Sequence, residues 1–288
     1  MKYGLTLPNV GPYGDARTLA NLARIAEGAG WDGVFVWDVL HYEAEDKAVC
    51  DPWVALAAIA MQTERIKIGT MVAVPSRRRP WKMAREAVSL DHLSRGRLIL
   101  GIGAGDADDK GFTQFGEETD AKKRARLLDE SLEILQGLWS GQPFSYSGEH
   151  YHFEKITFLP TPIQKPRIPI WIAGTWPRKG PMSRAARWDG VFATIRRDDG
   201  NMAAISAESV EPLKQWMDEH RTSTSAPGSA PFDIIVSGPA FAAEHDEQAR
   251  ATLKAYADAG ATWCLKFIGL TDDIESLRAS IQQGPPRL

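Results

Sequence analysis

Residues 96–106 read GRLILGIGAGD, a short apolar run that breaks into alternating glycines and ends on a carboxylate. A dinucleotide-binding loop requires the spacing G-x-G-x-x-G directly after a strand. Frames that start at Gly101 and at Gly103 both lack the third glycine. We therefore interpret this stretch as a buried strand whose carboxyl end presents glycine-rich backbone, and not as a Rossmann loop.

The composition is that of a globular protein with no electrostatic preference for polyanions. The chain has 288 residues, 43% hydrophobic and 25% charged, with a formal net charge of -3. This balance indicates no nucleic-acid partner and no membrane partner, so a small-molecule substrate is the expected ligand. Cys50 and Cys264 lie too far apart for a C-x-x-C motif, and the first residues lack a signal-peptide pattern, so we expect a cytoplasmic protein.

The chain alternates short apolar runs with longer amphipathic stretches, many of them opened by Asp, Ser or Pro. Apolar runs without period-two alternation are typical of parallel strands covered by helices. Strands are predicted at residues 3–7, 33–37, 66–74, 97–101, 168–173, 190–195, 232–237 and 262–268. Helices are predicted at residues 15–28, 51–62, 81–93, 121–139, 206–220, 244–259 and 272–282.

About eight strand-helix units in roughly 250 residues predict a (β/α)₈ TIM barrel. A doubly wound sheet is the competing α/β architecture. We expect residues 1–288 to form a single barrel domain with an insertion at about residues 142–167, after the fourth unit. Within the insertion, residues 142–153 have the pattern of a hairpin with Gly148 in its turn. Residues 222–231, TSTSAPGSAP, are predicted to be a loop.

In a barrel of this kind, catalytic groups lie at the carboxyl ends of the strands, whereas the opposite end serves stability. On the catalytic side fall Asp38 and His41 after the second strand, and residues 103–106 after the fourth. Residues 90–97, LDHLSRGR, fall on the stability side. Gly103 and Gly105 are explained either by an ordinary βα turn or by a flat ligand that lies against the main chain.

Several motifs, in order along nearly the whole chain, resemble those of the bacterial-luciferase-like flavin- and deazaflavin-dependent oxidoreductases. They are GWDGVFVWD at 30–38, DPWVAL at 51–56, TERIKIGTMV at 63–72, LDHLSRGR at 90–97, LGIGAG at 100–105, PIQKPRIPIWIAG at 162–174, RAARWDG at 184–190 and ADAGATW at 257–263. Each motif alone is weak, but the set is specific. The resemblance implies a (β/α)₈ barrel that binds FMN or the deazaflavin coenzyme F420 in its mouth.

The resemblance also assigns residues to the cofactor. It implies a non-prolyl cis peptide between Met71 and Val72, whose backbone would press against the middle of the ring. It places Ala104 and Gly105 beside the ring, and Asp38 near the pyrimidine edge. Ala173, Gly174 and Thr175 correspond to the positions that meet the cofactor phosphate.

Two candidate catalytic residues follow from the same comparison. In many deazaflavin-dependent members a histidine that transfers protons directly follows the position of Asp38, but this chain has Val39 there and His41 two residues later. Asp106 falls where some members carry a catalytic glutamate, and an aspartate there could equally cap the next segment.

Other polar and aromatic residues have two explanations. Arg77–Arg79 form either a solvated face or a site for an anionic cofactor tail or substrate. His150 and His152 are spaced for a metal pair but lack further ligands nearby, which favours ordinary hairpin residues. Tryptophans near the mouth either wall a pocket or pack in the core; these are Trp37, Trp53, Trp81 and Trp176.

The resemblance predicts an oxidoreductase that acts on a small organic substrate. With F420 the reaction is hydride transfer. With FMN it is monooxygenation, and a separate flavin or F420 reductase is a possible partner. The alternative from another class is a flavin-binding barrel without catalysis, and a metal-dependent hydrolase is disfavoured because few histidines end strands. The resemblance also suggests a homodimer.

Overall fold

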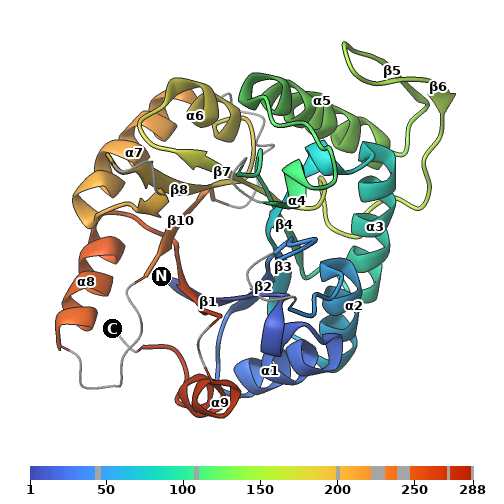
Figure 1. Ribbon diagram of the computed structural model, residues 1–288. Helices are drawn as coiled ribbons and strands as arrows, with labels where there is room; N and C mark the ends of the chain where they lie inside the picture. The colour runs from blue at the N-terminus through green and yellow to red at the C-terminus, as the bar shows by residue number, and fades with distance from the viewer. Residues whose placement is uncertain are drawn as a thin grey trace.

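Eight parallel strands close into a barrel in the part of the chain that the computed structural model describes, which is residues 1–42, 47–106, 110–198, 202–221, 231–238, 247–270 and 273–286. In ring order they are β1 (Lys2–Leu7), β2 (Gly33–Val36), β3 (Lys67–Ala73), β4 (Leu98–Ile102), β7 (Ile170–Thr175), β8 (Gly190–Arg196), β10 (Asp233–Ser237) and β11 (Trp263–Phe267). Pairing of β8 with β10 and of β11 with β1 closes the ring (Figure 1). The predicted barrel is confirmed, and the doubly wound sheet is excluded.

Helices surround the barrel (Figure 1). They are α1 (Ala16–Gly28), α2 (Pro52–Gln62), α3 (Pro80–Leu93), α5 (Ala121–Trp139), α6 (Lys179–Ala185), α7 (Ala207–His220), α8 (Glu247–Asp258) and α9 (Ile274–Gln282). Aspartates accept backbone N–H bonds at the starts of α1, α2, α5 and α9, which explains why Asp predicted these helix starts. The first residues of the helices predicted at 244–259 and 272–282, and most of the loop predicted at 222–231, lie outside the described residues.

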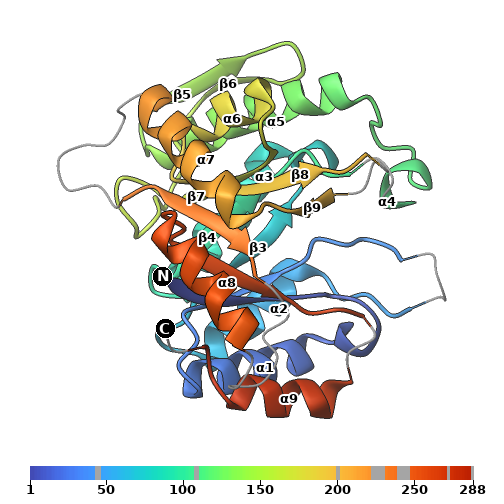
Figure 2. The ribbon, with the colours of Figure 1, turned by 90° about the vertical axis from the view of Figure 1, so that its left-hand side faces the viewer.

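Three short elements were missed in the sequence because they span too few residues to show a period. They are the single-turn helix α4 (Lys110–Thr113), the helix α6, and the strand β9 (Met202–Ala204), which pairs antiparallel with β8. Figure 2 shows α4 and β9 at one end of the barrel and both chain termini toward the other. The end with α4 and β9 is the carboxyl end of the strands.

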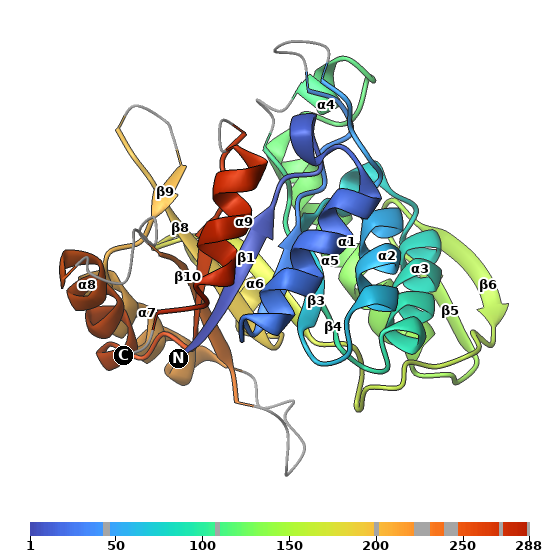
Figure 3. The ribbon, with the colours of Figure 1, turned by 90° about the horizontal axis from the view of Figure 1, so that it is seen from below.

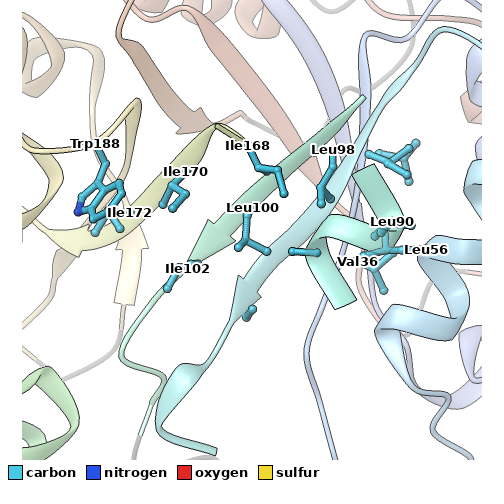
Figure 4. Close-up of a cluster of buried hydrophobic side chains, with 14 of the residues drawn as sticks. Val36, Leu56, Leu90, Leu98, Leu100, Ile102, Ile168, Ile170, Ile172 and Trp188 are labelled. Atoms are coloured by element: carbon cyan, nitrogen blue, oxygen red, sulfur yellow. The ribbon is translucent and has the colours of Figure 1, made fainter. Parts of the chain in front are cut away.

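The barrel strands are apolar on both faces because each face contacts a different core. Leu98, Leu100 and Ile102 of β4 point toward the surrounding helices (Figure 4), whereas Ile99 points into the barrel. The interior cluster consists of Phe35, Met71, Ile99, Trp171, Phe192, Ile235, Trp263 and Leu265. These side chains fill the barrel, so it is a packed core and not a pore.

The amino end of the barrel is stabilised by buried charges with complete sets of partners. The Asp91 carboxylate, fully buried, accepts backbone N–H bonds from Ile163 and Gln164. The Arg97 guanidinium donates to carbonyls of Ala60 and Ile66 among others. Residues 90–97 therefore lie away from the catalytic end of the barrel, as predicted.

A hairpin of β5 (Phe144–Ser147) and β6 (His152–Ile156) lies at the periphery, outside α3 and α5 (Figure 3). The Glu130 carboxylate of α5 accepts N–H bonds from Glu149, His150 and Tyr151, which holds the turn of the hairpin. His152 lies in β6 but His150 lies in the turn, so the two imidazoles do not share a strand face. Among the described residues, no cluster of three or more His, Cys, Asp or Glu could hold a metal ion, and no helix is long and apolar enough to cross a membrane.

Candidate active site

The floor of the barrel mouth is made of small side chains from three neighbouring strands. A Cβ on Gly103 would lie 2.9 Å from Val72 Cγ2 and 3.3 Å from the Cβ of Ala173. Val72 and Ala173 are only half-buried and pack on the interior cluster from above. Large rings fill the barrel below this layer, and the layer itself carries almost no side-chain bulk. A planar ligand fits such a floor.

The end of β3 is irregular, as expected. The Met71–Val72 peptide is cis, and the pairing of β3 with β4 shifts register between Thr70 and Ala73. The Met71 side chain is buried in the interior cluster, and Val72 lies on the floor. The cis peptide implied by the family resemblance is thus present in this chain.

Asp38 is a buried anchor for the loop that joins β3 to α3. Its side chain is 1% exposed. The carboxylate accepts the Val74 N–H at 3.1 Å and pairs with the Arg78 guanidinium at 2.6 Å. Burial opposes the charge of Arg78, yet its pKa is raised, because the Asp38 carboxylate attracts and hydrogen-bonds the guanidinium. Asp38 therefore fixes the backbone that follows Val72, a role that the sequence did not indicate.

A second anchor holds the glycine-rich end of β4. The Phe112 ring of α4, fully buried, lies between the guanidinium groups of Arg77 and Arg124, at 4.7 and 5.0 Å from its centroid. Arg124 also donates to the Ala104 carbonyl at 3.1 Å. Gly105 has φ +75°, and a Cβ there would lie 2.7 Å from Phe112 Cζ.

These contacts explain why residue 105 is a glycine without invoking a ligand, because Phe112 occupies the space that a side chain would need. Sequence reasoning missed this clamp. Its one signal was Arg124, a charged residue on the buried face of α5, four residues before Leu128.

The two candidate catalytic residues lie on loops at the mouth. His41 is half-buried, and its ring stands edge-on to Phe115 at 6.2 Å. Asp106 is exposed directly after Gly105. The loop that carries His41 is held by Asn9, whose side chain bonds the backbone of Val39 and the carbonyl of Cys50.

At the end of β7, the predicted phosphate-binding residues are half-buried. Helix α6 packs closely on Gly174, because a Cβ there would lie 2.9 Å from the Cβ of Pro181 and 2.8 Å from Met182 Cε. Thr175 accepts the Arg178 N–H through its carbonyl at 3.0 Å. Four exposed cations lie after β7 and at the end of β8, namely Arg178, Lys179, Arg196 and Arg197.

Two buried polar atoms on the segments that follow β2 and β3 lack hydrogen-bond partners in the described part of the chain. They are Trp37 Nε1 and Ser76 Oγ. Buried polar groups are rarely left unpaired. Both residues follow strands at the carboxyl end, so the residues present fit the polar edge of a flavin-type ring above the floor.

Of the other three tryptophans expected near the mouth, Trp176 is half-buried and packs against the core between the strands and the helices. Trp53 is buried in the core around α2. Trp81 lies outside the barrel, where its ring stands edge-on to Tyr151 and Phe153 of the hairpin region.

The luciferase-like monooxygenase family model matches residues 1–280, and the chain belongs to this family. Membership identifies it as an oxidoreductase. It is 31% identical over 199 residues to an uncharacterized protein of Mycobacterium tuberculosis, covering 63% of this chain and 69% of the relative. It is 33% identical over 174 residues to an F420-dependent glucose-6-phosphate dehydrogenase of Tsukamurella paurometabola, covering 56% of this chain and 48% of the relative.

A third relative is the oxygenase component of a flavin-dependent trigonelline monooxygenase from Acinetobacter baylyi, 30% identical over 159 residues, with 55% of this chain and 43% of the relative covered. Two solved structures share the fold along 98% of this chain and 97% of their own. One is a monooxygenase from Streptomyces bottropensis, with TM-score 0.76 and 22% identity. The other is an F420-dependent secondary alcohol dehydrogenase in complex with an F420-acetone adduct, with TM-score 0.73 and 17% identity.

The substitution Asp38→Asn tests the buried anchor. It leaves Arg78 as a buried cation without its counter-charge, so we expect the free energy of unfolding to fall by about 3–5 kcal/mol. Asp258→Asn removes the carboxylate of an exposed ion pair with Lys254 and serves as the control, with an expected loss below about 1 kcal/mol. Urea denaturation measures both, and equal losses would contradict the anchoring role.

Proposed function

We propose that this chain binds the deazaflavin coenzyme F420 in the barrel mouth and transfers hydride between it and a small organic substrate. The observation that carries the proposal is the floor of Val72, Gly103 and Ala173, which offers a flat apolar surface at the carboxyl end of the strands. F420-dependent dehydrogenases stand among both the relatives and the structures of the same fold. The exposed cations after β7 and at the end of β8 suit a long anionic tail.

FMN-dependent monooxygenation is the second candidate, because one relative is the oxygenase component of a flavin-dependent monooxygenase. The same floor would hold the ring of FMN. A separate reductase would then supply reduced flavin. A flavin-binding barrel without catalysis is the third candidate, and turnover with an added reductant would exclude it.

In this proposal some residues of the mouth contact the ring and others contact the phosphate. Ring contacts come from Met71, Val72, Ala104, Gly105 and Ala173, with Ser76 and Trp37 available to polar atoms of the ring. Gly174 and Thr175 would meet the phosphate. The cofactor itself supplies the carbon that gives or accepts the hydride.

The remaining step, proton transfer to or from the substrate oxygen, needs an acid-base group at the mouth. We assign it to His41, whose half-buried ring stands beside Phe115, and we place Asp106 near the substrate as a second catalytic group. We place Asp38 near the pyrimidine edge of the ring, where it positions the loop after β3, because Arg78 and the Val74 N–H already bind its carboxylate.

Titration of the purified protein with F420 and separately with FMN, followed by absorbance, tests the cofactor. We expect saturable binding with F420 tighter. Ala173→Leu adds bulk to the floor and should weaken binding by at least about tenfold. Ala121→Leu, at the exposed start of α5, is the control and should leave the affinity unchanged. If neither cofactor binds, the proposal is wrong, and if only FMN binds, the monooxygenase candidate replaces it.

The substitution His41→Gln tests proton transfer. With a substrate identified from a panel of sugar phosphates and secondary alcohols, we expect kcat to fall by about 100-fold because the acid-base group is lost. The affinity for the cofactor should change less than twofold. Asp106→Asn is tested in parallel, and an unchanged kcat in both variants would exclude these residues from catalysis.

We further propose that residues 1–288 act as one barrel domain, with residues 142–167 inserted after the fourth unit, and that it forms a homodimer through α2. None of residues 52–62 is charged, and Val54 and Met61 are 61% and 71% exposed on its outer face. Such an uncharged apolar face can pair with its own copy.

Met61→Glu places a charge in the proposed dimer interface and should raise the dimer dissociation constant by at least about tenfold. Light scattering coupled to size exclusion measures the mass at several concentrations. Gln62→Glu adds the same charge at the adjacent exposed position and is the control. A wild-type protein that remains monomeric at high concentration would refute the proposal.

A further inference from the structure

An apolar groove of about 550 Å³ lies outside the barrel, between the first turns of α3 and the hairpin. Figure 3 shows α3 and the hairpin at the side of the barrel, away from α4 at the mouth, so a groove lined by their side chains is distinct from the mouth. Its lining combines aromatic and aliphatic side chains with basic ones; these are Arg79, Trp81, Lys82, Arg85, His152, Phe153, Ile156 and Phe158. No acidic residue lines it.

Two arginines of the lining, Arg79 and Arg85, are positioned by contacts with aromatic rings of the groove. The Arg85 guanidinium lies 3.8 Å from the centroid of Phe158 and donates to the Leu159 carbonyl at 2.6 Å. The Arg79 guanidinium lies over the Trp81 ring at 5.9 Å. An arginine stacked on an aromatic ring keeps N–H groups available in its plane, and those groups match the two oxygens of a carboxylate.

We propose that this groove binds a small aromatic carboxylate. Its volume lies within the range of small-molecule sites. The rings of Trp81, Phe153 and Phe158 offer stacking surfaces to an aromatic body. Arg79 and Arg85 attract an anionic head, and Lys82, which pairs with the Glu86 carboxylate at 2.5 Å, adds a third cation at the edge of the groove. A cation is repelled by this lining. The outer face of α2 from a second copy has no acidic residue to complement it, so a free ligand fits better than a dimer contact.

The probe for the experiment is 2-naphthoate, titrated into the full-length protein at 0.15 M salt by calorimetry. We expect one saturable site per chain. The uncharged isostere 2-naphthamide should bind at least about tenfold more weakly, because it lacks the charge-assisted hydrogen bonds. Lys82→Glu and Ile156→Asp, both at exposed positions, should each weaken 2-naphthoate binding by at least about tenfold.

Lys155→Glu provides the matched control, because it makes the same charge change on β6 at an exposed position that does not line the groove. Its affinity for 2-naphthoate should stay within twofold of wild type, because the Lys155 side chain is not part of the groove lining. Four results would overturn the proposal: no saturable binding, equal affinity for 2-naphthamide, equal effects of Lys82→Glu and Lys155→Glu, or binding that F420 or FMN abolishes by competition. Conversion of a dimer to a monomer by Ile156→Asp, without a naphthoate site in wild type, would assign the groove to a second copy instead.

Discussion

The buried carboxylate of Asp38 is the constraint on which the mouth depends. A charge that is almost wholly removed from water is stable only when its partners are close and correctly oriented. Here the partners are the Arg78 guanidinium and the Val74 N–H, both on the segment after β3. Because β2 positions Asp38, it also determines where this segment runs, and thereby where Val72 lies on the floor.

The constraint extends from the third strand to the fourth. Arg77 donates to the Asp38 carbonyl at 2.6 Å and also lies over the Phe112 ring. Phe112 in turn packs beside Gly105 and occupies the space that a side chain would need there. Strand ends that are far apart in sequence are thus held by one connected set of contacts, and a ligand meets a surface that is formed before it binds. Such preorganisation reduces the ordering cost of binding.

The sequence predicted the barrel because its evidence is periodic and repeated. Eight apolar runs, each followed by an amphipathic stretch, constrain the architecture even where single boundaries shift by one or two residues, as for the strand expected at 97–101 and found at Leu98–Ile102. The cis peptide at Met71–Val72 was predicted only through the family resemblance, since no local pattern distinguishes it. Sequence analysis missed the partners of Asp38, Phe112 and Arg124 because these contacts join residues on different elements, and periodicity carries no information on such contacts. The glycines of the opening motif were recognised, but the side chains that require them were not.

The three consecutive arginines show most clearly why the candidate site could not be read in full from the chain. The sequence offered two explanations for Arg77–Arg79 as a unit, a solvated face or an anion site. In the structure each side chain has its own environment: Arg77 stacks on Phe112, Arg78 pairs with Asp38, and Arg79 lies over Trp81 at the outer groove. The reason is the backbone, which leaves a single 3₁₀ turn at Arg77 and is extended at Arg78 and Arg79, so that successive side chains point in different directions. The same short segment therefore stabilises the mouth through Arg77 and Arg78 and contributes the Arg79 cation to the outer groove. It connects the two candidate ligand sites along the chain.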